Sequence, residues 1–187
     1  MVSFGPAAIL VWLSVHPFIA FWRNVGAKIT LAGHFAGMFV VVGTLISYRD
    51  VLMRGDLGTS YVFAGFAVVL LTVSGVMRYF QNKVLPITAI MGISELDPAG
   101  TESKLVVEGP YARIRHPRYV QLLIAFGAYA LFANYATCYV FLLLAVIGVR
   151  IVIAFEEREL IARFGEAYRR YMETTPRFVP DWPGKLG

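Results

Sequence analysis

Long apolar runs separated by shorter polar stretches dominate the chain. Five runs approach the roughly 20 apolar residues that an α-helix needs to cross the hydrocarbon layer of a bilayer. They cover residues 6–22, 29–47, 61–77, 119–133 and 135–155. The last two runs meet at Asn134, which predicts a tight antiparallel hairpin. The pattern predicts an all-α integral membrane protein with about five transmembrane helices, in a single domain over residues 1–187.

The distribution of Lys and Arg predicts the topology. With five spans, 15 of the 17 basic residues fall on one side of the membrane, and only Arg49 and Arg54 fall on the other. By the positive-inside rule the basic side is cytoplasmic and the N-terminus is outside. The two large polar segments, about residues 78–118 and 150–187, then share the cytoplasmic side. We expect a multi-pass membrane protein with its active site on that side.

Composition narrows the possible partners. Hydrophobic residues make up 58% of the chain and charged residues 16%, against about a quarter charged in an ordinary soluble domain. A net charge of +5 on so apolar a chain favours anionic lipid headgroups over nucleic acid as the partner. Cys138 is the single cysteine, and His16 and His34 stand alone in different apolar runs. We therefore expect no disulfide and no metal site.

The segment after the last apolar run predicts an amphipathic helix. Leu160, Phe164, Tyr168 and Tyr171 recur at spacings of three and four residues, which places them on one helix face. Such a helix is expected to lie on the bilayer surface and to close a site beneath it. The pair Glu156–Glu157 lies where the last span leaves the membrane. A carboxylate there needs a cationic partner, which an arginine or a ligand ammonium would supply.

The polar motifs together resemble a known family. The stretch "KLVVEGPYARIRHPRYV" is followed by "EEREL" and then by "FGEAYRRYMETTPRFVP". Each motif is weak alone, but their ordered combination over about residues 103–180 resembles the membrane methyltransferases that use S-adenosylmethionine. These include the isoprenylcysteine carboxyl methyltransferases and the phospholipid N-methyltransferases. The resemblance implies a cofactor site at the cytoplasmic edge, formed by about residues 103–119 and 156–180.

The resemblance also implies which residues bind the cofactor. The matching positions are Lys104, Leu105, Val106, Tyr111, His116, Pro117, Arg118, Tyr119 and Glu156. These residue types suit the ligand, because a carboxylate binds an ammonium through a charge-assisted hydrogen bond and aromatic rings stabilise a sulfonium. His116 is also a candidate general base, since an amine or thiol acceptor must lose a proton during methylation.

Departures from the family pattern bear on the methyl acceptor. The carboxyl methyltransferases place a substrate-orienting arginine where this chain has Val152. Arg150 is two residues earlier, about 200° away around a helix, so either Arg150 or Arg115 reaches the acceptor or the acceptor is not a carboxylate. Gln121 also replaces the usual glycine. We expect a lipid-like or hydrophobic acceptor at the membrane interface. Its reacting group is a phospholipid amine, a prenylcysteine carboxylate or a thiol, of which an amine or thiol is favoured.

Two other functions fit the sequence. A membrane-embedded sterol-type reductase would bind a nicotinamide cofactor; the glycine-rich phosphate turn is missing, although such enzymes do not require it. A non-enzymatic lipid-binding membrane protein would use the basic cluster around residues 113–118 as a rim for anionic headgroups. That second reading accounts for the arginines but leaves the histidine, the tyrosine pair and the proline without a role.

Overall fold

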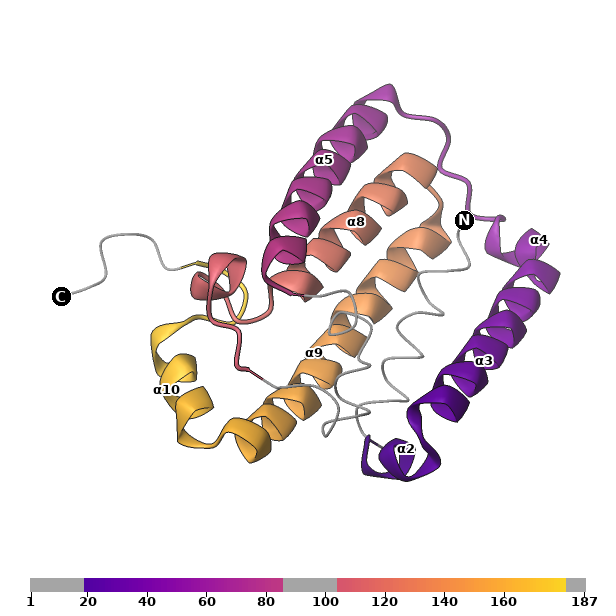
Figure 1. Ribbon diagram of the computed structural model, residues 1–187. Helices are drawn as coiled ribbons and strands as arrows, with labels where there is room; N and C mark the ends of the chain where they lie inside the picture. The colour runs from indigo at the N-terminus through magenta and orange to yellow at the C-terminus, as the bar shows by residue number, and fades with distance from the viewer. Residues whose placement is uncertain (1–18, 86–103, 181–187) are drawn as a thin grey trace.

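The computed structural model describes residues 19–85 and 104–180, and within these ranges the regular structure is entirely helical (Figure 1). The helices are α2 (Ile19–Val25), α3 (Ala27–Ser47), α4 (Arg49–Leu52), α5 (Tyr61–Val84), the 3₁₀ turn η2 (Gly109–Ala112), α8 (Pro117–Ala133), α9 (Ala136–Phe164) and α10 (Glu166–Thr174). In the described residues the only strand-like pairing is an isolated bridge between Asp56 and Tyr135. The all-α prediction is confirmed for these ranges.

Helices α5, α8 and α9 form a three-helix bundle with α8 in the middle (Figure 1). Polar side chains join α5 to α8 inside the bundle. Gln121 donates from Nε2 to Ser74 Oγ at 2.7 Å, and the Ser74 hydroxyl donates to the Gln121 carbonyl at 3.3 Å. Gln81 Nε2 donates to the Pro117 carbonyl at 3.2 Å. Gln121, which departs from the family pattern, therefore has a packing role between the two helices.

Three described helices are long and apolar enough to cross a membrane, at 29–47, 61–84 and 136–164. They contain the second, third and fifth predicted spans. The fourth prediction corresponds to α8, which has 17 residues and falls short of the roughly 20 that spanning requires. The first prediction lies largely outside the described residues. Large apolar side chains such as Phe39 and Phe66 point outwards, as lipid-facing residues do.

The predicted amphipathic helix is divided into two parts. Helix α9 continues past the expected span to Phe164, and the chain then turns at Gly165 into α10 (Figure 1). Gly165 has φ 56° and ψ −126°, a backbone conformation that glycine adopts with little strain. The turn brings Tyr168 and Tyr171 inwards, where both are buried.

The two ends of the bundle are closed in different ways, and we call them the far end and the site end. At the far end α8 turns into α9 through Asn134, which has φ 51° and ψ 43°. Its side chain donates to the Gly58 carbonyl at 2.7 Å and accepts from the Tyr139 hydroxyl at 2.9 Å. The Ala136 amide donates to the Gly55 carbonyl at 2.8 Å. The loop before α5 is thereby fixed to the hairpin turn.

Candidate functional site

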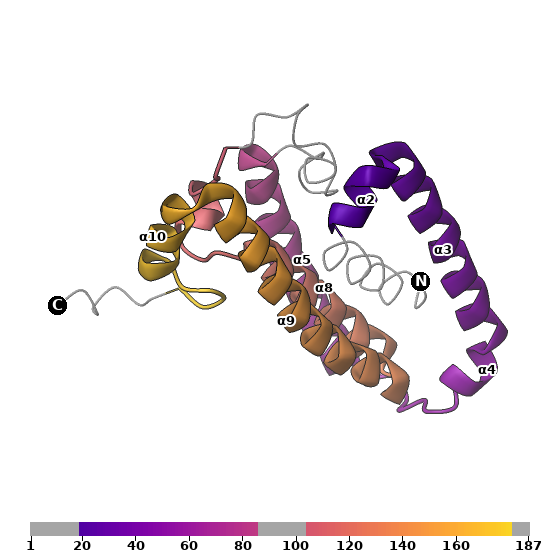
Figure 2. The same cartoon turned by 90° about the horizontal axis from the view of Figure 1, so that it is seen from below.

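The site end lies opposite the α8–α9 turn. It contains the start of α8, the end of α9, helix α10, the segment 104–116 and the residues 175–180, which we call the C-terminal strap (Figures 1 and 2). Pro117 occupies the first turn of α8, where a missing N–H costs nothing, and His116 immediately precedes it. The start of α8 thereby fixes His116 beside the end of α9.

Glu157 is the centre of a buried charged cluster. Its Oε1 accepts from Arg115 Nε and Nη2 at 3.3 and 3.2 Å, and from His116 Nε2 at 3.0 Å. Arg177 donates to both carboxylate oxygens, through Nε to Oε1 at 3.2 Å and through Nη2 to Oε2. A carboxylate with this many N–H donors is held in its ionised form. Glu157 therefore joins α9, the start of α8 and the strap.

Backbone hydrogen bonds reinforce the position of the strap. The amides of Arg115 and His116 donate to the carbonyls of Pro176 and Arg177, at 2.9 and 3.2 Å. Arg115 Nη1 also donates at 2.7 Å to the carbonyls of Met172 and Thr175. The Arg115 guanidinium thus makes four hydrogen bonds within the protein, two to Glu157 and two to carbonyls at the end of α10.

His116 has a polar side and an apolar side. On the polar side, Nε2 meets Glu157 as described, and Nδ1 lies 3.8 Å from Glu156 Oε2. On the apolar side, the ring centroids of Tyr119 and Phe178 lie 5.8 and 6.3 Å from the imidazole. Phe178 packs onto the buried cluster that includes Tyr119 and Val152. The histidine therefore stands between a charged compartment and the apolar interior of the bundle.

Glu156 differs from its neighbour in having acceptor capacity left over. Its Oε2 is buried and has no hydrogen-bond partner among the described residues, and the same holds for the Tyr168 hydroxyl. Burial raises the pKa of Tyr168, and the negative charges of Glu157 and Glu156 raise it further. Tyr168 is therefore a neutral hydroxyl close to both carboxylates. A buried polar atom without a partner is costly, and this combination indicates a place for a polar ligand.

Tyr111, in η2, interacts electrostatically with Glu156. Its carbonyl accepts a hydrogen bond from the Tyr171 hydroxyl at 2.6 Å, which connects η2 to α10. Burial raises the pKa of the Tyr111 phenol, with an opposing effect from Arg118 and a supporting one from Glu156. Gly109 begins η2 at φ 60°, and a Cβ at this position would come within 3.0 Å of Val84. This close approach sets η2 against the end of α5.

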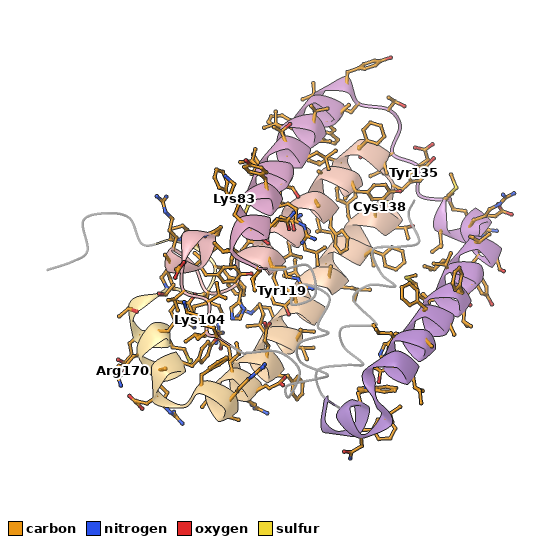
Figure 3. All side chains as sticks on the ribbon, viewed as in Figure 1. Lys83, Lys104, Tyr119, Tyr135, Cys138 and Arg170 are labelled. Carbon is orange, nitrogen blue, oxygen red and sulfur yellow. The ribbon has the colours of Figure 1, made fainter. Side chains whose placement is uncertain are left out.

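The structure brings most of the predicted cofactor-binding residues together. Tyr111, His116, Pro117, Tyr119 and Glu156 lie around the start of α8 and the end of α9, and Arg118 interacts electrostatically with Tyr111. The segment Lys104–Val106 precedes η2, and Lys104 lies at the same end of the bundle (Figure 3). Lys104 is exposed and pairs with Glu108 at 3.9 Å (Figure 3). Leu105 and Val106 are half-buried.

The three candidate catalytic residues lie in different settings. His116 is buried in the cluster and Arg115 is engaged with Glu157. Arg150 is exposed on α9, with its guanidinium carbon 5.8 Å from the centre of the Phe178 ring. Val152, at the position of the family's substrate-orienting arginine, is a buried core residue. Position 152 is therefore apolar in this chain, whereas the carboxyl methyltransferases are expected to have a carboxylate-binding arginine there.

The site residues predicted from the sequence did not include Glu157, Tyr168, Arg177 and Phe178. Helical periodicity placed Tyr168 on an apolar face, although its hydroxyl lies beside two carboxylates. The strap residues follow Thr175 and Pro176, where the sequence predicts an extended chain without indicating what it contacts. Charge could have indicated their pairing, because Glu157 needs a cationic partner and Arg177 is one of the basic residues that follow it.

The fold and the site together define a helical membrane protein with a buried charged cluster at one end of its bundle. The model of the phospholipid methyltransferase family matches residues 66–167, and the chain belongs to this family. This stretch covers most of α5, all of α8 and α9, and the start of α10. The family assignment predicted from the motifs is confirmed.

Two curated relatives resemble the chain. Methanethiol S-methyltransferase 1 from Bradyrhizobium diazoefficiens is 30% identical over 135 residues, which cover 67% of this chain and 43% of the relative. Protein-S-isoprenylcysteine O-methyltransferase from Schizosaccharomyces pombe is 35% identical over 77 residues, covering 41% of this chain and 33% of the relative. The chain thus matches less than half the length of each relative. No solved structure matches it.

Proposed function

We propose that the protein is an S-adenosylmethionine-dependent methyltransferase that acts on a hydrophobic acceptor at the membrane interface. The observation that carries the proposal is the buried Oε2 of Glu156, which has no hydrogen-bond partner among the described residues and lies beside His116. It belongs to the motif combination of the family, and it fits the ammonium of the cofactor. The concentration of Lys and Arg in the segments around this end supports a cytoplasmic location for it.

The protein's own residues would provide position and charge. S-adenosylmethionine, when bound, supplies an activated methyl group on a sulfonium. Glu156 would hold the ammonium, and Tyr111 and Tyr119 would supply aromatic walls for the adenine and the sulfonium. Tyr168 would remain a neutral hydrogen-bond donor, because burial and the nearby carboxylates raise its pKa. Alignment of the reacting atoms by such residues can contribute about 7–11 kcal/mol to lowering the barrier.

A thiol is the acceptor that the geometry favours. Arg115 is bound to Glu157, and Val152 is buried, so the carboxylate fork of the carboxyl methyltransferases has no counterpart at these positions. Phe178, Tyr119 and the surrounding core present an apolar surface to an incoming acceptor. One relative is named as a methanethiol S-methyltransferase. We infer a hydrophobic thiol as the first acceptor class, with a phospholipid amine second because the family description names phospholipids.

Ligand binding and methyl transfer test the proposal in sequence. S-adenosylhomocysteine, the demethylated product, should raise the melting temperature of the purified protein, since a ligand that binds the folded state stabilises it. A response to reduced nicotinamide dinucleotide instead would favour a reductase. Labelled methyl transfer is then measured with short alkyl thiols, phosphatidylethanolamine vesicles and a prenylcysteine. We expect transfer to the thiols, unchanged by Arg150→Ala; transfer to prenylcysteine that Arg150→Ala abolishes would contradict the acceptor assignment.

A further inference from the structure

The contact between His116 and Glu157 determines which ring nitrogen carries a proton. Glu157 accepts N–H groups from Arg115 and Arg177 and is ionised. An ionised carboxylate can only accept hydrogen bonds. His116 Nε2, 3.0 Å from Glu157 Oε1, must therefore be the donor. The proton on Nε2 follows from the partners of Glu157.

The other ring nitrogen faces an oxygen that also lacks a donor. His116 Nδ1 and Glu156 Oε2 are 3.8 Å apart, which is too long for a hydrogen bond between them. Oε2 is buried without a hydrogen-bond partner among the described residues. If Nδ1 is bare, the two atoms are acceptors that face each other across a short gap. One cationic donor placed beside both would satisfy them together.

The charges around His116 favour a bare Nδ1 when a cation binds. Its polar neighbours are Glu156 and Glu157, and its other ring neighbours are the aromatic rings of Tyr119 and Phe178. The guanidiniums of Arg115 and Arg177 both pair with Glu157, so Glu156 is the carboxylate that faces His116 Nδ1. A ligand ammonium next to Glu156 would repel an imidazolium, so the neutral ring is the form compatible with the bound cation.

We propose that Glu157 and Arg177 are positioning residues that hold His116 as its Nε2–H tautomer, so that Nδ1 and Glu156 Oε2 together accept the ammonium of the ligand. The inference rests on the proposed function, because that function supplies the ammonium. It assigns His116 to ligand binding through Nδ1, and it makes the C-terminal strap part of the site through Arg177. Tautomer control through a neighbouring carboxylate is a general means of orienting histidine.

Side-chain NMR of ¹⁵N-histidine-labelled protein reads the tautomer directly. The chain has three histidines, so comparison with His116→Asn identifies the His116 signals. With S-adenosylhomocysteine bound, we expect one protonated nitrogen and one bare nitrogen whose shift moves on ligand addition. Two protonated nitrogens in the complex, or a bare nitrogen that does not respond to the ligand, would overturn the proposal.

Variants of Arg177 test the role of the strap. Arg177→Ala should weaken S-adenosylhomocysteine binding about 10- to 150-fold, the range expected for a charged hydrogen bond, and Arg177→Lys should recover part of the loss. Arg170→Ala is the matched control, since Arg170 is an exposed arginine of the neighbouring helix α10 (Figure 3). Melting temperatures without ligand show whether each variant is folded.

The outcomes separate this inference from the proposed function. If the wild-type protein does not bind S-adenosylhomocysteine, the proposed function fails. If the wild type binds but a folded Arg177→Ala variant binds equally well, with the same His116 shifts, only the role of Arg177 and Glu157 is refuted. Weaker binding by Arg177→Ala that Arg177→Lys partly recovers, with altered His116 shifts, supports it.

Discussion

Both ends of the α5–α8–α9 bundle are closed by hydrogen bonds between its helices and the neighbouring segments, but the groups that form these bonds differ. At the far end, Asn134 and the backbone of the preceding loop close the hairpin with neutral hydrogen bonds of 2.7–2.9 Å. At the site end, closure uses a buried carboxylate and two guanidiniums. The far end shows that closing this bundle does not require charge.

Charge at the site end is therefore better explained by ligand binding than by stability. Burying an ion pair costs desolvation that its Coulomb attraction repays only with excellent geometry, so a buried pair is weak evidence for stabilisation. At the far end, both polar atoms of the Asn134 side chain have hydrogen-bond partners. At the site end, Glu156 Oε2 and the Tyr168 hydroxyl have no hydrogen-bond partner among the described residues. A cationic ligand would donate hydrogen bonds to the Glu156 oxygen.

Glu156→Gln should produce the largest effect that separates the two ends. Replacing the carboxylate removes the charge that holds the ligand ammonium, so S-adenosylhomocysteine binding should weaken by about 1.5–3 kcal/mol, or about 10- to 150-fold. Without ligand, the melting temperature should stay the same or rise, because the charge on a buried carboxylate oxygen without a described hydrogen-bond partner has been removed. Calorimetric titration and thermal unfolding measure the two quantities. A large loss of stability with unchanged binding would make Glu156 structural.

Asn134→Ala should show the opposite pattern. The variant loses two side-chain hydrogen bonds at the far end, and alanine fits the left-handed backbone of this turn poorly. We expect the free energy of unfolding to fall by about 1–2 kcal/mol. Asn134→Gly is the matched control, because it relieves the backbone strain while losing the same side-chain bonds. Ligand affinity of the folded variant should be unchanged, and a drop in affinity would mean that the two ends are coupled.

The sequence was sufficient for the features that depend on local pattern. Apolar runs predicted the helices α3, α5 and α9, and Asn134 marked the hairpin turn, because helix length and turn chemistry are encoded within short segments. The motif around His116 and Glu156 predicted several of the residues that meet at the site end, among them Arg115 and Tyr119. Pro117 indicated the start of α8, because proline suits the first turn of a helix.

Contacts between distant segments were harder to predict. Glu157 lies 20 positions before Arg177 and about 40 after Arg115, and no periodicity connects them. The break at Gly165 also changed the expected surface helix, because it turns α10 back so that Tyr168 and Tyr171 face the cluster. Periodicity counts a tyrosine as part of an apolar face and says nothing about where its hydroxyl points. The different hydrogen-bond partners of Glu156 and Glu157 therefore became clear only from the three-dimensional arrangement.

The smallest effect is expected at a neutral bond of the charged end. The Tyr171 hydroxyl donates to the Tyr111 carbonyl at 2.6 Å, and burial raises the pKa of Tyr171 to about 12, opposed by the positive charge of Arg115. Tyr171→Phe should lower the free energy of unfolding by about 0.5–1.5 kcal/mol at neutral pH. Tyr168→Phe is the matched control and should cost less, since its hydroxyl has no hydrogen-bond partner among the described residues.

The stability difference between wild type and Tyr171→Phe should depend on pH if the buried phenol hydrogen bond causes it. A phenol whose pKa is about 12 when folded, against 10.0 as the ordinary value, keeps its proton in the folded state after the unfolded chain has lost it. The stabilisation is fully present below about pH 10 and is lost as the pH rises towards 12, because the unfolded state then binds fewer protons. Unfolding measured at pH 7, 9 and 10.5 should give equal differences between wild type and Tyr171→Phe at the first two values and a smaller one at the third. A difference that stays constant across all three would mean that Tyr171 is not held as a buried hydrogen-bond donor, and that the connection between η2 and α10 depends on packing alone.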